Sequence, residues 1–101
     1  MFKYIQKIEQ LTADKTDGEA LFEDWADFDA TVLNLILIGE CVAKMTADFK
    51  KSHPQIPWRL IKDFRNYAVH NYEDVDPEMV WEVAKFDIPK LAADLRQILA
   101  Q

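Results

Sequence analysis

The feature that most constrains the fold is an apolar stretch near the middle of the chain. Residues 24–51 hold no proline and a single glycine, which predicts one long helix from Asp24 or Asp27 to about Lys51. Five large apolar side chains fall within six positions of it: Leu33, Leu35, Ile36, Leu37 and Ile38. Because successive residues of a helix point in different directions, these side chains need cover on several sides, from the rest of a bundle or from a second copy.

The spacing of apolar residues and the positions of glycine and proline predict helices on both sides of this stretch. Apolar residues recur along residues 2–11 at the spacing of one helix face. Thr16-Asp17-Gly18 ends that helix and caps a short turn after it. A further helix is expected over residues 58–71, because the two prolines of His53-Pro54-Gln55-Ile56-Pro57 exclude continuous helix before it.

The last part of the chain predicts a helix with a well-marked start. Asp76-Pro77 places a carboxylate where it caps a helix and a proline in the first helical position. This helix is expected to bend or break before Pro89 and to resume through Ile98. No segment alternates in the manner of a strand, and there is no repeat or linker. Residues 1–101 are therefore expected to form a single all-α domain, an up-and-down antiparallel bundle of four or five helices.

The composition agrees with one compact domain and restricts its partners. Half of the 101 residues are hydrophobic, 30% are charged, and the formal net charge is −6. So much apolar surface on a small domain favours association with a second copy. A chain that is negative overall is not a general polyanion binder, so any nucleic-acid site must be local.

The sequence also predicts a cytoplasmic location. Cys41 is the only cysteine and cannot form a disulfide within the chain, which suits a reducing compartment. Residues 1–5 lack the features of a secretory signal. The apolar stretch from Val32 to Gly39 is far short of the roughly 20 residues that span a bilayer, so no membrane partner is expected.

Basic residues are concentrated in one part of the chain. Residues 44–70 hold six basic residues against two acidic ones, a balance of +4, whereas the rest of the chain carries −10. A local positive potential of this kind attracts a phosphate backbone. Arg59 and Lys62 are the candidate residues for contacts to RNA phosphates.

The helix expected over residues 58–71 divides into an apolar and a polar face. At about 100° per residue, Arg65, Asn66 and His70 face outward from one side of the helix. Tyr72 would return to within roughly 20° of Arg65 if the helix persists that far. The predicted core stripe consists of Leu60, Ile61, Phe64, Tyr67 and Ala68.

Histidine and arginine on one surface can together transfer protons and bind phosphate. Histidine moves a proton near neutral pH, and a guanidinium binds a phosphate and stabilises added negative charge. Arg65 and His70 together could cleave RNA without a metal, by promoting attack of the ribose 2′-hydroxyl on the adjacent phosphate. One histidine alone is little for general acid–base catalysis. Two copies of the chain that pair across this face would supply two histidines, enough to share the acid and base roles. By spacing alone, however, an exposed arginine and histidine are more often ordinary solvated residues.

Cofactor sites are not indicated. Cys41 and His53 have no further cysteine or histidine at ligand spacing, so no metal site is expected. Glycine-rich phosphate loops and the motifs of serine or cysteine nucleophiles are absent from the sequence, and no cofactor is expected.

Three further residues have structural interpretations. Glu40, a carboxylate in the apolar helix, is expected either to be exposed at a helix edge or to be paired, with Arg65 or Arg59 as partner, and a structural role is favoured over a catalytic one. Trp58 and Trp81 are expected to pack in the core or at a dimer interface rather than to stack on bases.

One eight-residue segment resembles the signature of a known family. It reads Arg65-Asn66-Tyr67-Ala68-Val69-His70-Asn71-Tyr72 and is similar to the R-N-x-x-x-H-x-Y motif of the HepT-like ribonuclease toxins, a branch of the all-helical HEPN superfamily. The resemblance covers the chain from about residue 20 to its end, and Cys41 departs from it where alanine is usual. Further segments that look like family positions are Ile38-Gly39-Glu40, Pro54-Gln55-Ile56-Pro57-Trp58-Arg59, Val75-Asp76, Val80-Trp81 and Asp87-Ile88-Pro89-Lys90-Leu91.

The resemblance implies a homodimer in which the R-x4-H motifs of both protomers meet in one cleft and cut RNA without a metal. On the matching motif positions, the resemblance implies that Arg65 and His70 are the catalytic pair and that Asn66 helps to orient them.

It also implies a partner. Family toxins are usually encoded beside a nucleotidyltransferase antitoxin of the MntA type, as in a type VII toxin–antitoxin pair. That antitoxin transfers AMP from ATP to the motif tyrosine, here Tyr72, and the added phosphate would exclude RNA. The alternative hypothesis is a non-catalytic helical partner that binds nucleotide or acts as a scaffold for a small nucleotidyltransferase.

Overall fold

The computed structural model describes residues 1–100, most of which belong to seven α-helices. In chain order they are α1 (Phe2–Thr12), α2 (Gly18–Glu23), α3 (Trp25–Ala43), α4 (Ala47–Ser52), α5 (Trp58–His70), α6 (Pro77–Glu82) and α7 (Ile88–Leu99). A 3₁₀ turn, η1 (Tyr72–Asp74), follows α5, and a π-helical segment, η2 (Val83–Asp87), joins α6 to α7. No strand occurs within residues 1–100, so the all-helical prediction is confirmed. Within the same residues, no helix combines the length and the apolar character that crossing a membrane requires.

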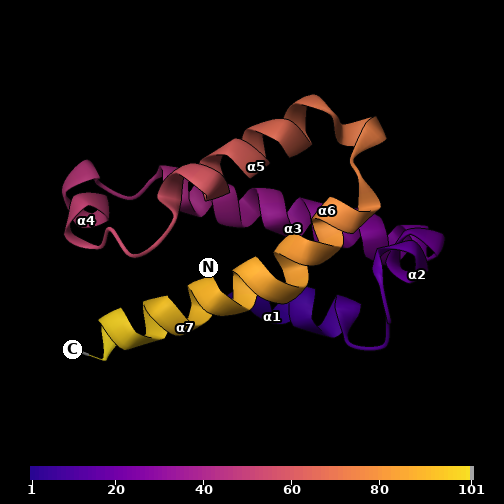
Figure 1. Ribbon diagram of the computed structural model, residues 1–101, viewed down its shortest axis with the longest axis horizontal. Helices are drawn as coiled ribbons and strands as arrows, with labels where there is room; N and C mark the ends of the chain where they lie inside the picture. Colours follow the sequence, from indigo (N-terminus) through magenta and orange to yellow (C-terminus); the bar gives the residue numbers. More distant parts are fainter. Residues whose placement is uncertain (101) are drawn as a thin grey trace.

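The longer helices run in alternating directions (Figure 1). α1, α3 and α5 succeed one another in this way, and α6, η2 and α7 form one nearly continuous rod that returns along α1. The short helices α2 and α4 lie at opposite ends of the long axis, which extends over 40 Å. They raise the number of helices above the four or five expected from the sequence.

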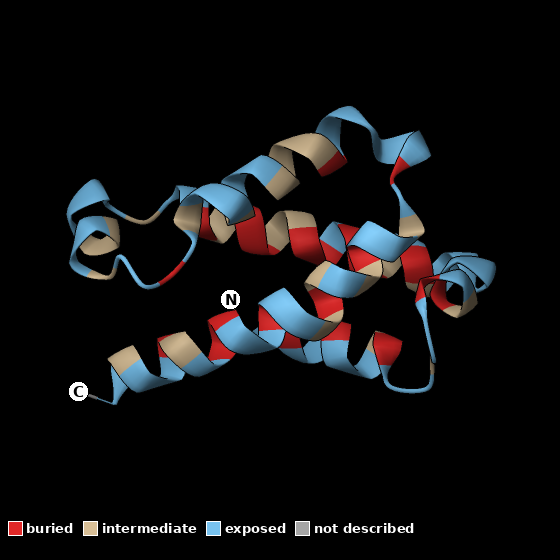
Figure 2. Cartoon of the chain, in the orientation of Figure 1, coloured by how far each residue is buried: buried red, intermediate tan, exposed pale blue. Residues whose placement is uncertain are grey.

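α3 lies at the centre of the core. Its residues Val32, Leu35 and Ile38 are buried in one cluster with residues of α1 and of the α6–η2–α7 rod. Figure 2 shows the buried residues concentrated along α3 and on the inner sides of α1 and α7. Leu33, in contrast, is 52% exposed. The chain therefore covers most sides of its apolar helix but not all of them.

The prediction of one helix from residue 24 to about residue 51 is wrong. α3 ends at Ala43, and the backbone of Thr46 is extended, with φ −67° and ψ 153°. The Oγ1 atom of Thr46 accepts a hydrogen bond from the N–H of Phe49 at 3.1 Å and caps the start of α4. Because a threonine that caps a new helix competes with continuation of the old one, the chain turns here without proline or glycine.

Two predicted features of the last part of the chain are confirmed. Asp76 Oδ1 accepts a hydrogen bond from the N–H of Glu78 at 3.0 Å, and Pro77 opens α6. The helix then changes to π-helical hydrogen bonding over η2 and resumes at Ile88, directly before Pro89. Since proline has no N–H to donate, the wider turn lets the chain accommodate Pro89 while remaining helical.

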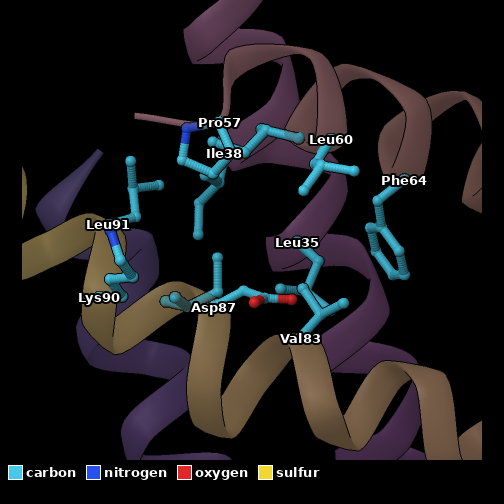
Figure 3. A pocket seen from close by; sticks show the side chains of 11 residues that line it. Leu35, Ile38, Pro57, Leu60, Phe64, Val83, Asp87, Lys90 and Leu91 are labelled. Atoms are coloured by element: carbon cyan, nitrogen blue, oxygen red, sulfur yellow. The ribbon is translucent and has the colours of Figure 1, made fainter. Parts of the chain in front are cut away.

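α5 is thinly covered by the rest of the chain. Ala68 is its one buried residue. Most of the predicted core stripe is half-buried, but Leu60 is 69% exposed, and its assignment to the core is wrong. Leu60 lines an apolar groove between α5, α3 and the rod formed by η2 and α7 (Figure 3). That groove has a volume of about 70 Å³, well below the ~300 Å³ of a typical ligand pocket.

Lys15 connects the segment between α1 and α2 to the start of α3. Its Nζ lies 2.9 Å from Asp14 Oδ1, 2.9 Å from Asp27 Oδ2 and 3.6 Å from Asp24 Oδ2. The hydrogen bonds to Asp14 and Asp27 raise the pKa of Lys15, and the hydrogen bond from Lys15 lowers the pKa of Asp14. This ion-pair group stabilises the end of the molecule where α2 lies.

Charge is separated along the long axis. Residues 13–29, around α2 and the start of α3, hold seven acidic residues and one basic residue. Residues 44–70, which include α4 and α5, carry the balance of +4. Because α2 and α4 lie at opposite ends in Figure 1, the molecule has an acidic end and a basic end.

Candidate active site

Arg65 packs against α3 at a position that has no side chain. A Cβ built on Gly39 would lie 2.5 Å from the Cβ of Arg65 and 2.7 Å from its Cγ. Two carbon atoms in non-bonded contact normally lie about 3.5–4.0 Å apart, so any residue larger than glycine would force α5 away from α3. Gly39 therefore allows the close approach that sets the position of Arg65.

The guanidinium of Arg65 is fixed by two side chains. Its Nε donates to Glu40 Oε1 at 2.7 Å, and its Nη2 contacts the same oxygen. Its Nη1 donates to Asn66 Oδ1 at 2.9 Å. Of the two alternatives predicted for Glu40, the structure shows the paired one, with Arg65 as the partner. The Nε of Arg59 instead lies 4.0 Å from Asp63 Oδ2.

Arg65 keeps part of its hydrogen-bonding capacity for a ligand. A guanidinium has five N–H donors, and the contacts to Glu40 and Asn66 use three of them. The Arg65 side chain is 33% exposed, and two of its donors form no hydrogen bond with the described residues. Because Glu40 neutralises much of the charge of Arg65, long-range attraction for a phosphate has to come from neighbouring cations.

Such cations line a hollow beside Arg65. It lies between the C-terminal part of α3, α4 and α5 and has a volume of about 650 Å³. Its charged lining residues are Lys50, Arg59, Lys62, Arg65 and the acidic Asp63, a balance of +3. The structure thus brings the predicted RNA contacts Arg59 and Lys62 into one concavity with Arg65 and Asn66. We call this concavity the basic hollow.

His70 and Tyr72 lie toward the other end of α5. His70 is the last residue of α5 and is exposed, and five helical residues place it about 140° around the helix from Arg65. Since α5 ends there, the condition that would place Tyr72 beside Arg65 is not met. Tyr72 begins η1 and is 55% exposed. Within residues 1–100 of one chain, Arg65 forms hydrogen bonds with Glu40 and Asn66 but not with His70 or Tyr72.

Two residues of this site, Gly39 and Lys50, are not assigned an individual role from the sequence. An isolated glycine in an apolar helix is a signal of close helix packing, and that signal identifies Gly39. No comparable signal identifies Lys50, because its place in the hollow depends on α4 being separate from α3. Trp58 and Trp81 pack against the core, as predicted. Residues 1–100 contain no group of three or more His, Cys, Asp or Glu side chains arranged to hold a metal.

Comparison with known proteins identifies the family. A family model described as "Ribonuclease HepT-like" matches residues 1–98. The chain is 33% identical over 94 residues to the "Probable ribonuclease HepT" of Thermococcus cleftensis, with 93% of this chain and 84% of that protein covered. It is 31% identical over 97 residues to the "Gamma-glutamylcyclotransferase and putative RNase MJ0434" of Methanocaldococcus jannaschii, and this alignment covers 96% of the chain but only 43% of that relative. No solved structure matches the chain. On the extent of the family match, the chain belongs to the HepT-like ribonuclease family.

Proposed function

We propose that this chain is a metal-independent endoribonuclease with Arg65 and His70 as its catalytic residues. The observation that carries the proposal is the fixed guanidinium of Arg65, held by Glu40 and Asn66 at the wall of the basic hollow. A guanidinium held in this way is suited to bind a phosphodiester and to stabilise the charge that develops in the transition state. Membership of the HepT-like ribonuclease family supports the same reaction.

In the proposed reaction the ribose 2′-hydroxyl attacks the adjacent phosphorus, and the bond to the 5′-oxygen of the next nucleotide breaks. The products are a 2′,3′-cyclic phosphate and a 5′-hydroxyl. His70 takes the proton of the 2′-hydroxyl or gives one to the leaving oxygen, because imidazole titrates near neutral pH. Arg65 stabilises the additional negative charge on the phosphoryl oxygens. No metal is needed in any of these steps.

We also propose that a second copy completes the site. A single imidazole cannot act as acid and base at the same moment, and His70 lies about 140° around α5 from Arg65. Uncovered apolar side chains flank Arg65: Leu33 lies on α3 two turns before Glu40, and Val69, 43% exposed, follows Arg65 by one turn. Burial of this strip in a homodimer would bring the two sets of motif residues into one cleft.

The regulation that fits this site is modification of Tyr72. We propose a cytoplasmic toxin neutralised by a nucleotidyltransferase of the MntA type that adenylylates Tyr72. Exposure of Tyr72 at the start of η1 leaves its hydroxyl accessible to another enzyme. The Tyr72 oxygen would bond to the α-phosphorus of ATP, with pyrophosphate as the leaving group. The added phosphate and nucleoside would repel and obstruct RNA.

The test is cleavage of single-stranded RNA by purified protein. Wild type should cut the RNA in the presence of EDTA, and His70→Ala and Arg65→Ala should each lose at least about 100-fold in rate. Arg96→Ala is the matched control, because Arg96 lies on α7 over the ring of Phe2 and outside the basic hollow. Folded wild type that leaves RNA intact would refute the nuclease and favour the non-catalytic partner of a nucleotidyltransferase.

A further inference from the structure

The basic hollow is larger than the contact of one phosphate with Arg65 requires. Its volume of about 650 Å³ lies within the range of ~300–1,000 Å³ typical of pockets that hold a whole small molecule. It extends from Arg65 across α5 to α4, and Lys50 of α4 contributes to its lining. Space and positive charge are therefore available for a second group next to the one bound by Arg65.

Lys50 owes its position to Trp58. The Nε1 of Trp58 donates to the carbonyl oxygens of Lys50 and His53, at 3.0 Å in each case. The ring of Phe49 lies 4.7 Å from that of His53 and 6.1 Å from that of Trp58, measured between centroids. α4 has no buried residue of its own, so these contacts fix it to the start of α5. They hold Lys50 at the hollow before any ligand arrives.

The two neighbouring lysines of α4 differ in their surroundings. Lys50 is half-buried and lines the hollow, whereas Lys51 is exposed and does not. Across the hollow, Lys62 forms no ion pair with another residue of the described chain, and neither does Lys50. Two uncompensated cations that face one concavity are suited to bind a phosphate as point charges.

We infer that the basic hollow is a second phosphate subsite, which binds through Lys50 and Lys62 the phosphodiester next to the scissile one on a single-stranded RNA. Trp58 is a positioning residue that acts through Lys50. This inference rests on the proposed function, because it takes the phosphate at Arg65 to be the one that is cut. A positively charged groove that follows the backbone of a flexible strand is a usual mode of single-strand binding.

The first experiment compares two substrates. A dinucleoside monophosphate, called the dinucleotide below, has only the scissile phosphate and cannot occupy the second subsite, whereas an oligonucleotide can. Lys50→Ala should lower kcat/KM for the oligonucleotide about fivefold at 0.1 M salt, the factor expected for one single-strand phosphate contact. Its effect on cleavage of the dinucleotide should be much smaller, because there it removes only long-range attraction and no direct phosphate contact. Lys51→Ala, which removes the same charge one residue away, should leave both unchanged.

The second experiment measures binding without cleavage. Fluorescence anisotropy of a labelled RNA oligonucleotide with the His70→Ala protein gives the slope of log affinity against log salt concentration. Adding Lys50→Ala should reduce the steepness of that slope by about 0.7. Trp58→Phe replaces the indole with a smaller aromatic ring that has no N–H donor, and it should weaken binding in the same direction. Combined with Lys50→Ala it should add little further loss, because both changes act on one contact.

The outcomes separate the subsite from the nuclease. Equal losses for Lys50→Ala and Lys51→Ala, or an equal loss with the dinucleotide, would overturn the subsite while the nuclease stands. Fully additive effects of Trp58→Phe and Lys50→Ala would overturn the positioning role of Trp58. RNA that wild type does not cut would refute the proposed function, and the anisotropy slopes would then decide the subsite alone.

Discussion

The Cα of Gly39 faces the stem of Arg65 so closely that a Cβ at residue 39 would lie 2.5 Å from the Cβ of Arg65. The packing of α3 against α5 and the position of the guanidinium thus depend on one contact. Glu40, the next residue of α3, then holds the same guanidinium through Nε at 2.7 Å. Two adjacent residues of α3 therefore determine where Arg65 lies and how it is oriented.

Gly39→Ala should impair both stability and catalysis. The added methyl group forces α5 outward, which should destabilise the fold by about 1–3 kcal/mol. The shift of Arg65 should lower the rate of RNA cleavage at least ~10-fold. Gly18→Ala is the matched control, because its Cβ would lie 2.8 Å from the carbonyl oxygen of Pro77, at the end of the molecule where α2 lies. Both variants should unfold at lower temperature by circular dichroism, and equal activity of the two below that temperature would contradict the role of Gly39.

Glu40→Ala should lower kcat without raising KM. Loss of the carboxylate frees the guanidinium to move, which should cost about 10- to 100-fold in kcat. It also removes a negative charge beside the phosphate, so RNA should bind at least as tightly. Glu40→Gln keeps an oxygen that can accept from Arg65 and should recover part of the rate. Steady-state kinetics decide the matter, and a higher KM with unchanged kcat would argue against orientation by Glu40.

Leu33→Glu should disrupt the proposed homodimer. Light scattering of wild type should report about twice the chain mass of 11.8 kDa, because the proposed homodimer would bury the exposed apolar strip that includes Leu33. A carboxylate placed in that strip should give a monomer with much reduced cleavage. Leu99→Glu, at a residue 71% exposed at the end of α7, should remain dimeric and active. A monomeric wild type at micromolar concentration would count against the composite cleft.

Tyr72→Phe should fold normally and escape adenylylation. After incubation with a MntA-type enzyme and ATP, mass spectrometry should find one adenylyl group on wild type and none on the variant. Tyr67→Phe is the control: the Tyr67 oxygen accepts a hydrogen bond from the Asp76 N–H at 3.0 Å, so this variant should lose about 1 kcal/mol of stability but still be modified. Unmodified wild type would refute the modification of Tyr72 and leave the nuclease untouched.

Lys15→Met should lower the melting temperature in a way that depends on pH. The lowered pKa of Asp14 means that the ion pair stabilises the fold above the unfolded value near 3.8 and that this contribution is lost as the pH falls through the folded value. The difference in melting temperature between wild type and Lys15→Met should therefore be constant near neutral pH and shrink below about pH 4. Lys3→Met, at an exposed residue of α1, should show no such difference. A gap that persists in acid would contradict this account.

Most of the helices follow from local chemistry that a sequence displays. Asp76-Pro77 marks the start of α6 because a cap and a fixed φ angle act within a few residues. The end of α3 was not predictable in the same way, because Thr46 can cap a new helix or sit within an old one, and tertiary contacts of α4 with Trp58 select the first. Leu60 likewise fits an apolar stripe by spacing, yet its exposure depends on how far α7 lies from α5.

The candidate site was predictable in composition but not in geometry. Periodicity places Arg65 and Asn66 on one helix face, and Glu40 stands out as a carboxylate within an apolar helix that would be exposed or paired. The contact of Gly39 with Arg65 joins residues 26 positions apart and depends on the crossing of two helices. The position of Tyr72 depends on where α5 ends, which helical-wheel geometry assumes rather than determines.

The separation of acidic and basic ends along the 40 Å axis makes the molecule an electric dipole. Near an RNA strand the field exerts a torque that turns the α4 end toward the strand and the α2 end away from it. Salt limits this effect to the last ~8 Å of the approach at physiological ionic strength. A net-negative protein can therefore approach a polyanion in one preferred orientation. Repulsion over most of its surface disfavours the orientations in which the basic end points away from the strand.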